Sequence, residues 1–226
     1  MLWGVFRSLF NHRPPSIATS AHPNRWDDDS QEHYDVITDF KIVTFNMLAP
    51  CYKRLYSPDQ EKSKGIDLLR RSSFRESSKD FIWQARARDS LAFFNAELFE
   101  ADVIALQEFW LEEEYASLFY KEIERNGFYV HTLKRSDAKS DAVAILVRKQ
   151  NFEIVKIKHV ILSRFGDRVA LVLWLKYFYH NSDHEKYVNL VVANTHLSFP
   201  HNEFIRDSQL EQMKTLTGNL TFTLFF

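Results

Sequence analysis

The alternation of hydrophobic and polar residues predicts a series of helices and strands between residues 40 and 216. Apolar residues at near-helical spacing predict helices, and short runs rich in β-branched and aromatic residues between polar turns predict strands. In chain order we expect a strand at 40–45, a helix at 81–100 capped by Ser77 or Ser78, a strand at 103–106, a helix at 112–125, strands at 128–133, 142–147, 152–162, 169–179 and 187–197, and a helix at 203–216. Strands joined partly by helices and partly by hairpins indicate a layered α/β sandwich rather than a doubly wound sheet.

The first 38 residues differ in composition from this periodic part of the chain. Residues 1–26 contain no Asp or Glu, yet they hold Arg7, Arg13 and Arg25 among apolar side chains. This composition is typical of an organelle transit peptide and also of an unstructured tail. We therefore predict a leader at 1–38, either a transit peptide or disordered, followed by one folded domain at 39–226.

Charge and cysteine content narrow the class of protein. The chain has 29 basic and 30 acidic side chains, a net charge of -1, which argues against binding nucleic acid by bulk charge alone. The single cysteine, Cys51, cannot form an internal disulfide, so we expect a reducing intracellular compartment. No run approaches the ~18 apolar residues that a membrane span needs. The expected location is the cytoplasm, or a mitochondrion or plastid if the leader is a transit peptide, with no membrane partner and no signal for an oligomeric state.

Polar side chains stand where three of the predicted strands end. Asn46 follows the first strand directly, and Glu108 follows the strand at 103–106 after one residue. Asn194 and His196 lie two positions apart at the end of the last strand, so they project from the same face. Ligands of α/β proteins gather at such strand ends, and we expect these side chains to share one cleft.

The residue types at these positions suit phosphoryl chemistry. A lone carboxylate such as Glu108 suits Mg²⁺, or Mn²⁺ in its place, and the Asn46 amide can complete or orient the metal shell. His196 and Asn194 can donate hydrogen bonds to a phosphate oxygen as charge develops there. Taken singly, Asn46 is more typical of a turn, Glu108 of a helix approach and His196 of a buried histidine with its hydrogen bonds satisfied.

Three sequence strings resemble one known superfamily. "VTFNMLAP" at 43–50, "VIALQEFW" at 103–110 and "VVANTHLSFPH" at 191–201 resemble, in this order, motifs of the endonuclease/exonuclease/phosphatase, or DNase I-like, superfamily. The nearest branch holds nocturnin, the Angel proteins and the deadenylases, with plant-type members described as calcium-binding that share "YKRLY" and "FGDRVA". The resemblance, which covers roughly 41–216, implies a DNase I-like four-layer α/β/β/α sandwich.

The resemblance also implies roles for individual residues. Glu108 would be the magnesium-ligating glutamate, with Asn46 beside the metal. His196 would contact the phosphate, and Asn194 would support it, so that Glu108, His196 and Asn194 form the catalytic group. The resemblance extends to two substrate-binding candidates, Asp141 and Arg206. Asp141 stands where the family has Asp-Gly, although Ala142 replaces the glycine here, and Arg206 lies in the helix that follows the histidine motif.

The implied function is that of a Mg²⁺-dependent phosphodiester hydrolase, a 3′-to-5′ RNA exonuclease of the deadenylase kind, with RNA or another phosphodiester as its partner.

The family also carries an Asp-x-Asn motif and a terminal Asp-His pair, which do not follow the helix at 203–216 here. Similar strings at 166–168 and 182–184 stand in the wrong order. We therefore expect the domain to be the amino-terminal portion only, incomplete at its carboxyl end, and weak or inactive. The alternatives are a non-catalytic fragment that binds metal or a partner, and a phosphomonoesterase acting on nucleotides or inositol phosphates.

Overall fold

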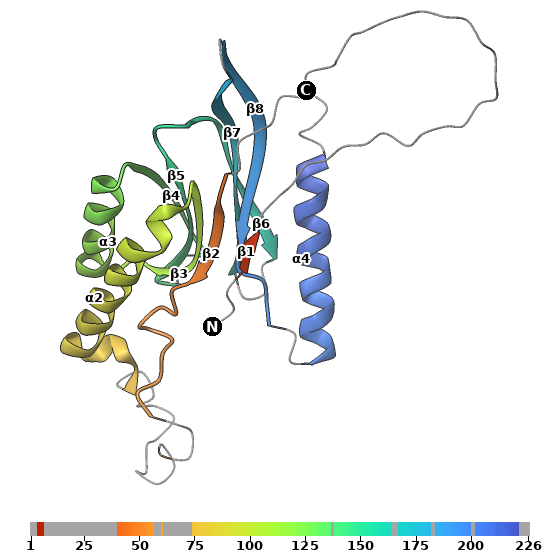
Figure 1. Ribbon diagram of the computed structural model, residues 1–226. Helices are drawn as coiled ribbons and strands as arrows, with labels where there is room; N and C mark the ends of the chain where they lie inside the picture. The colour runs from red at the N-terminus through yellow and green to blue at the C-terminus, as the bar shows by residue number, and fades with distance from the viewer. Residues whose placement is uncertain are drawn as a thin grey trace, which may run out of the picture.

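The computed structural model describes residues 4–6, 40–56, 60, 74–136, 138–163, 167–181, 184–199 and 202–221. These residues form two β-sheets packed face to face, with helices on both outer sides (Figure 1). The elements are β1 (Gly4–Phe6), β2 (Ile42–Asn46), η2 (Glu76–Ser78), α2 (Asp80–Ala96), η3 (Leu98–Glu100), β3 (Val103–Trp110), α3 (Glu113–Arg125), β4 (Phe128–Lys134), β5 (Asp141–Arg148), β6 (Phe152–Ser163), β7 (Arg168–Asn181), β8 (His184–Thr195) and α4 (Glu203–Thr221).

The first sheet has the strand order β1-β2-β3-β5-β4. β2 and β3 pair in parallel, because the chain between them crosses the sheet through α2, whereas β5 pairs antiparallel with both β3 and β4. β1 pairs antiparallel with β2 and is a strand that the sequence did not predict; the rest of the predicted leader, 1–3 and 7–38, lies outside the described residues. The second sheet, β6-β7-β8, is built from two antiparallel hairpins, as the consecutive strands predicted.

Three hydrophobic layers hold the sandwich together. α2 and α3 cover the outer face of the first sheet through a hydrophobic cluster rich in aromatic residues, in which the Tyr115 and Phe119 ring centroids lie 4.8 Å apart. Fully buried aliphatic side chains, among them Ile145 and Leu171, fill the space between the two sheets. α4 packs on the outer face of the second sheet through Leu216. The expected α/β/β/α order of layers is therefore confirmed.

Several element ends differ from the predictions. α2 begins at Asp80 with Lys79 as its N-cap residue and no side-chain cap, so the predicted capping by Ser77 or Ser78 is wrong. The Ser78 hydroxyl donates to the Arg75 carbonyl instead, and the predicted helix at 81–100 divides into α2 and η3. The predicted helix at 112–125 begins one residue too early, because α3 starts at Glu113. Glu112 is its N-cap residue, and the Glu112 side chain accepts from the Tyr115 amide.

Two further corrections concern the carboxyl half. β8 ends at Thr195, so His196 lies beyond the strand, and α4 continues past 216 to Thr221. Gln212 fastens α4 to the segment after His196, because its side chain accepts from the Ser198 amide and donates to the Ser198 hydroxyl. Helical propensity alone does not reveal such a contact, since the two residues meet only after the chain has turned.

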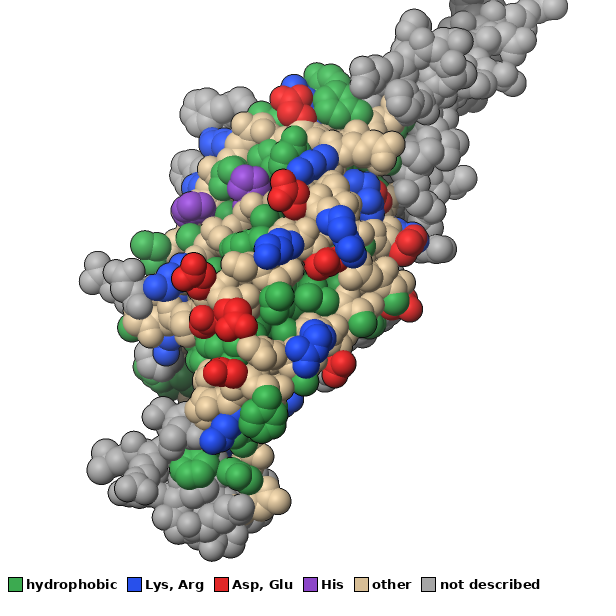
Figure 2. Space-filling model, turned by 90° about the vertical axis from the view of Figure 1, so that its left-hand side faces the viewer, with side chains coloured by type: hydrophobic (Ala, Val, Ile, Leu, Met, Phe, Trp, Pro, Cys, Tyr) green, Lys and Arg blue, Asp and Glu red, His purple; other side chains and the backbone are tan. Residues whose placement is uncertain are grey.

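The surface agrees with the balanced charge of the sequence. Figure 2 shows acidic and basic side chains interspersed on the face that carries α2 and α3, with no broad field of one sign. None of the helices that the structure describes is both long and apolar enough to cross a lipid bilayer.

Truncation of the aromatic core should destabilise the domain strongly. Phe119 is fully buried between α3 and the first sheet, so Phe119→Ala should lower the free energy of unfolding by about 3–5 kcal/mol through lost transfer energy and a new cavity. Phe81→Ala on α2, where the ring is exposed, is the matched control and should change it by less than about 0.5 kcal/mol. Urea unfolding of both variants measures the difference, and equal effects would contradict this assignment of the core.

Candidate functional site

A β-bulge near the carboxyl end of β3, the central strand of the first sheet, positions Glu108. The β3–β5 register shifts between Leu106, opposite Ala144, and Phe109, opposite Ala142. Glu108 lies in this shift with a left-handed backbone, φ 54°, a conformation that costs a non-glycine residue roughly 1–2 kcal/mol. The prediction that the strand stops before Glu108 is therefore wrong, because the bulge turns the residue out of the ladder while β3 continues to Trp110.

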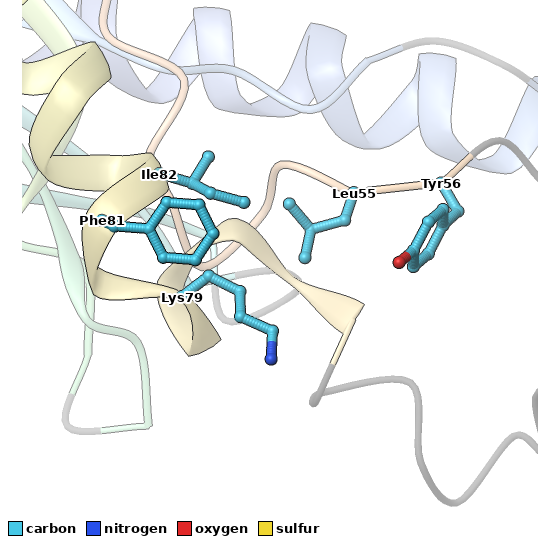
Figure 3. A pocket seen from close by; sticks show the side chains of 5 residues that line it. All are labelled: Leu55, Tyr56, Lys79, Phe81 and Ile82. Carbon is cyan, nitrogen blue, oxygen red and sulfur yellow. The ribbon is translucent and has the colours of Figure 1, made fainter.

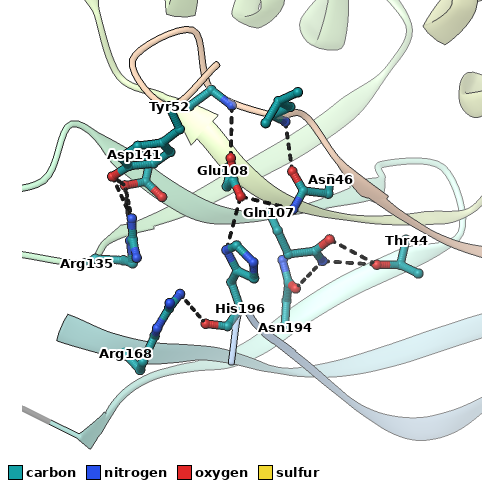
Figure 4. Close-up of polar contacts among 12 residues, drawn as sticks. Thr44, Asn46, Tyr52, Gln107, Glu108, Arg135, Asp141, Arg168, Asn194 and His196 are labelled. Carbon is teal, nitrogen blue, oxygen red and sulfur yellow. Dashed lines mark hydrogen bonds and ion pairs between the residues drawn. The ribbon is translucent and has the colours of Figure 1, made fainter. Parts of the chain in front are cut away.

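The turn after β2 orients the Glu108 carboxylate (Figure 4). Asn46 Nδ2 donates to Glu108 Oε1 at 3.2 Å, and the Ala49 amide donates to Oε2 at 3.2 Å. Asn46 Oδ1 in turn accepts from the Leu48 amide at 2.8 Å. The predicted pair of Asn46 and Glu108 is thus brought into direct contact from two neighbouring strands.

His196 approaches the same carboxylate from the second sheet. Its Nδ1 lies 3.7 Å from Glu108 Oε1, and this buried nitrogen has no hydrogen-bond partner among the described residues. Arg168 fixes the backbone at this point by donating from Nη1 to the His196 carbonyl at 2.9 Å. Burial lowers the pKa of His196 below its usual 6.5, and the nearby Glu108 carboxylate partly opposes that effect. Burial thus disfavours the protonated form of the imidazole that faces Glu108.

Asn194 joins the two sheets. Its Nδ2 donates to the Leu106 carbonyl of β3 at 2.7 Å and to the Ala144 carbonyl of β5 at 2.8 Å. Its Oδ1 accepts from Gln107 Nε2 at 2.7 Å, and the residue is only 3% exposed. Both amide hydrogens are engaged, so in this structure Asn194 positions the chain that leads to His196 and has no donor left for a phosphate.

Asp141 lies in a buried ion pair beside this cluster. Arg135 Nη2 is 2.7 Å from Asp141 Oδ1, and Tyr52 donates its hydroxyl hydrogen to the same oxygen at 2.5 Å. Burial raises the pKa of Tyr52, and the hydrogen bond to Asp141 raises it further. The carboxylate is therefore neutralised by protein groups, and it faces Arg135 and Tyr52.

Arg206 lies apart from these residues. It is exposed on the first turns of α4 and pairs with Glu203 at 3.9 Å. Among the described residues no contact joins Arg206 to the cluster around Glu108, so its expected role in substrate binding stays a prediction.

The donor set around Glu108 fits a sparsely ligated hard cation. Among the described residues, no group of three or more His, Cys, Asp and Glu side chains is arranged to hold a metal ion. Mg²⁺ commonly takes only one or two protein carboxylates and keeps several waters, which matches one carboxylate with an amide beside it. The types of donor group suit the ion, but the Asn46 oxygen is not turned toward Glu108 in this structure. Asn46 directs its side-chain nitrogen there instead.

A surface hollow elsewhere is lined by different residues. It has a volume of about 320 Å³ and is formed by Leu55, Tyr56, Lys79, Phe81 and Ile82 (Figure 3). Its lining is mainly apolar and includes no residue of the Glu108 cluster, so the polar site and this hollow are separate features.

Sequence reasoning missed several residues of the site. Tyr52 and Arg168 lie in strings that the resemblance had singled out, and that was the available signal for them. Gln107, adjacent to the predicted glutamate, shares a pair of hydrogen bonds with Thr44 as well as contacting Asn194. Arg135 gave no signal, because its partner Asp141 is brought opposite only by the β4–β5 hairpin.

Comparison with known proteins identifies the fold. No family model matches the chain. A protein of Arabidopsis thaliana described as an uncharacterized calcium-binding protein is 30% identical over 182 residues, which cover 79% of this chain and 35% of that protein. Protein angel homolog 2 of Danio rerio is 28% identical over 131 residues, 55% of this chain and 22% of that protein.

Solved structures agree in architecture. ANGEL2, a 2′,3′-cyclic phosphatase in complex with adenosine-2′,3′-vanadate, superposes with a TM-score of 0.50 at 24% identity over 76% of this chain and 45% of its own. The human nocturnin catalytic domain with bound sulfate gives 0.52 at 17% identity over 81% and 58%. An endonuclease/exonuclease/phosphatase family protein from Bacteroides thetaiotaomicron gives 0.50 at 14% identity over 80% and 58%. The chain has the endonuclease/exonuclease/phosphatase fold.

The expected DNase I-like superfamily fold is thus confirmed, close to the Angel and nocturnin structures. It is a fold on which phosphoester hydrolases are built. The chain spans about a third or less of the length of the curated relatives that it matches, so the activity, substrates and partners of the whole protein are matters for proposal.

The amide bridge made by Asn194 should be essential to the stability of the sandwich. Asn194→Asp replaces two donors by a buried negative charge that faces two carbonyl oxygens, and it should lower the free energy of unfolding by about 3–5 kcal/mol. Asn189→Asp, the same change at an exposed position of β8, should cost less than about 0.5 kcal/mol. Thermal or urea unfolding compares the two variants, and a tolerated Asn194→Asp would show that the bridge is dispensable.

Proposed function

We propose that this chain carries the Glu108 side of the active site of a Mg²⁺-dependent phosphoester hydrolase that cleaves RNA from its 3′ end. The observation that carries the proposal is the meeting of Glu108, Asn46 and His196 where β2, β3 and β8 come to one edge of the sandwich. Residues from β2, from β3 and from the segment directly after β8 converge there in a fold on which phosphoester hydrolases are built.

Glu108 would hold the metal ion, with Asn46 beside it. Glu108 is partly buried, at 13% side-chain exposure, and its two oxygens accept only one N–H donor each, so lone pairs remain for a cation. When bound, Mg²⁺ would polarise a phosphoryl oxygen and neutralise developing charge. Mn²⁺ takes oxygen ligands of the same kind and serves as a probe for this site.

Protein donors near the carboxylate suit a phosphate group. His196 Nδ1 and Arg168 Nε are buried and have no hydrogen-bond partner among the described residues. A guanidinium and an imidazole can bind phosphate oxygens and stabilise charge as it builds during in-line attack. Arg135 lies close enough to Arg168 for its charge to lower the pKa of that guanidinium further, after burial. Asp141 offsets the charge of Arg135, so Arg168 is the cation beside Glu108 that a phosphate group could engage.

Asn194 and Asp141 would act indirectly. Asn194 holds the end of β8 in register with the bulge, and that register sets the position of His196 two residues later. Asp141 fixes Arg135, so a contact between the substrate and this corner would pass through the arginine. Arg206 is retained as a candidate substrate contact that awaits a test.

Removal of the Glu108 charge should eliminate metal binding. Glu108→Gln keeps the shape of the side chain but loses the anionic ligand, so Mn²⁺ affinity should fall by more than about 100-fold, and any Mg²⁺-dependent RNA cleavage should be lost with it. Glu113→Gln on the exposed first turn of α3 is the control and should leave both unchanged. Electron paramagnetic resonance of free and bound Mn²⁺ gives the affinities. Retained Mn²⁺ binding in Glu108→Gln would refute the metal assignment.

A second candidate substrate is an RNA end that carries a 2′,3′-cyclic phosphate. It is favoured by the ANGEL2 structure, which has the same fold and is described with adenosine-2′,3′-vanadate bound. Both candidates place a phosphodiester of the terminal ribose against Glu108, and they differ in the leaving group. In the exonuclease reaction the neighbouring nucleotide leaves from phosphorus, and in the opening of the cyclic phosphate the 2′-oxygen leaves.

The two candidates can be separated with three RNA oligonucleotides of one sequence. If the chain is an exonuclease, the oligonucleotide with a 3′-hydroxyl should shorten stepwise in Mg²⁺, and the one with a blocked 3′ end should not. If it opens cyclic phosphates, only the 2′,3′-cyclic end should change, without shortening. Gel electrophoresis of the products reads both results. Release of phosphate from inositol phosphates or nucleotide monoesters alone would instead support a phosphomonoesterase, and Mn²⁺ binding without any turnover would support a non-catalytic chain.

A further inference from the structure

The turn that follows β2 supplies both hydrogen bonds that orient the Glu108 carboxylate, one from Asn46 and one from the Ala49 amide. Between these residues, Leu48 has a left-handed backbone with φ 50°, and its side chain is exposed. Leucine is strained in this conformation by its Cβ atom, and the exposed side chain packs into no core that would hold it there. Leu48 itself is therefore held through its backbone, while the side chains of its neighbours Met47 and Ala49 are buried in the core.

Arg86 of α2 makes those backbone contacts. Its Nη1 donates to the Met47 carbonyl at 3.0 Å, and its Nη2 donates to the Leu48 carbonyl at 2.8 Å. The two carbonyls belong to the peptide groups immediately before and after the strained residue. One planar guanidinium thus fixes both peptide planes at once, which the single point charge of a lysine ammonium cannot do.

The opposite ends of these two peptide groups point into the site. The peptide group of the Met47 carbonyl carries the Leu48 amide, which donates to Asn46 Oδ1. The peptide group of the Leu48 carbonyl carries the Ala49 amide, which donates to Glu108 Oε2. Arg86 therefore holds the oxygen ends of the same two groups whose N–H ends orient Asn46 and Glu108.

Glu76 holds Arg86 in this orientation. Glu76 is fully buried, and its Oε1 accepts from Arg86 Nε at 2.6 Å, while its Oε2 pairs with Lys53 Nζ at 3.1 Å. Each of the three guanidinium nitrogens thereby donates to a protein group. A buried carboxylate with two cationic partners is costly to assemble and confers geometry on what it holds.

We propose that Arg86 is the positioning residue of the Glu108 site, acting through the two peptide planes on either side of Leu48. Arg86 does not touch the Glu108 carboxylate. It sets the direction of the two groups that donate to that carboxylate, the Asn46 amide and the Ala49 backbone N–H. The inference rests on the proposed function in one respect, namely that Glu108 is the metal ligand, and its structural part can be tested without any metal.

The structural part is tested by amide hydrogen exchange. Arg86→Lys keeps a positive charge for Glu76 but loses the fork, so the Leu48 and Ala49 amides should exchange roughly tenfold faster or more. The amide of Ile145 in the centre of β5 should be unchanged, because Ile145 packs in the cluster between the two sheets and not in the cluster that contains Met47 and Ala49 of the turn. Arg88→Lys, at an exposed position of the same helix, is the matched control and should alter none of the three.

The link to the metal is tested by Mn²⁺ affinity in the same variants. Side chains that orient a ligand typically contribute 10- to 100-fold to metal affinity, so Arg86→Lys should weaken Mn²⁺ binding by roughly that factor. Arg88→Lys should bind as the unaltered chain does. If Arg86→Lys does not fold, Arg86→Gln, which keeps one amide donor for the turn, serves for the same two measurements.

The outcomes separate the two ideas. Unchanged exchange of the Leu48 and Ala49 amides in Arg86→Lys would overturn the positioning role, and so would a uniform acceleration that includes Ile145. If the unaltered chain binds no Mn²⁺, the proposed metal site is refuted, while faster exchange confined to the turn still supports the positioning of Glu108 by Arg86.

Discussion

The side-chain amide of Asn194 is the interaction on which the rest of the site depends. The bulge that carries Glu108 interrupts the β3–β5 ladder, and Asn194 of the opposite sheet donates to a carbonyl of each strand at that interruption. A buried carbonyl without a partner costs about 1–3 kcal/mol, so the bulge and the sheet-to-sheet contact stabilise each other. Because His196 follows Asn194 by two residues, the same amide brings the histidine to the Glu108 carboxylate.

Backbone strain is concentrated around the contact between the Glu108 bulge and Asn194. Leu48, Glu108 and Asp167 are the described non-glycine residues with positive φ, and each is held by polar contacts. Arg86 holds the carbonyls on either side of Leu48, donors from the turn hold Glu108, and the Ser136 hydroxyl donates to Asp167. Strain that persists under such support is typical of functional sites, where it fixes a side chain in a direction that a relaxed backbone would not give.

The charges of the site are arranged in two groups with different surroundings. Asp141 is enclosed by Arg135 and Tyr52, so its charge is used within the protein. Glu108 receives two N–H donors and faces a histidine whose pKa burial has lowered, so its charge is left available for a cation. Arg168 is near both groups, and burial lowers its pKa while the carboxylates of Asp141 and Glu108 partly oppose that effect. This division separates a structural carboxylate from one that can bind a ligand.

The sequence by itself determined the order of the main helices and strands after residue 39, the layered fold and the choice of Asn46, Glu108 and His196 as residues that meet. Periodicity and strand ends are local properties, because side-chain alternation follows from backbone geometry over a few residues. Only the tertiary structure decided the bulge at Glu108, the engagement of both Asn194 donors, the Arg135–Asp141 pair and the clamp of Arg86 on the turn after β2. These contacts join residues from different strands and helices, and the Asn194 bond to Leu106 spans 88 positions. No local pattern encodes such distances, since they are set by how the two sheets and α2 pack together.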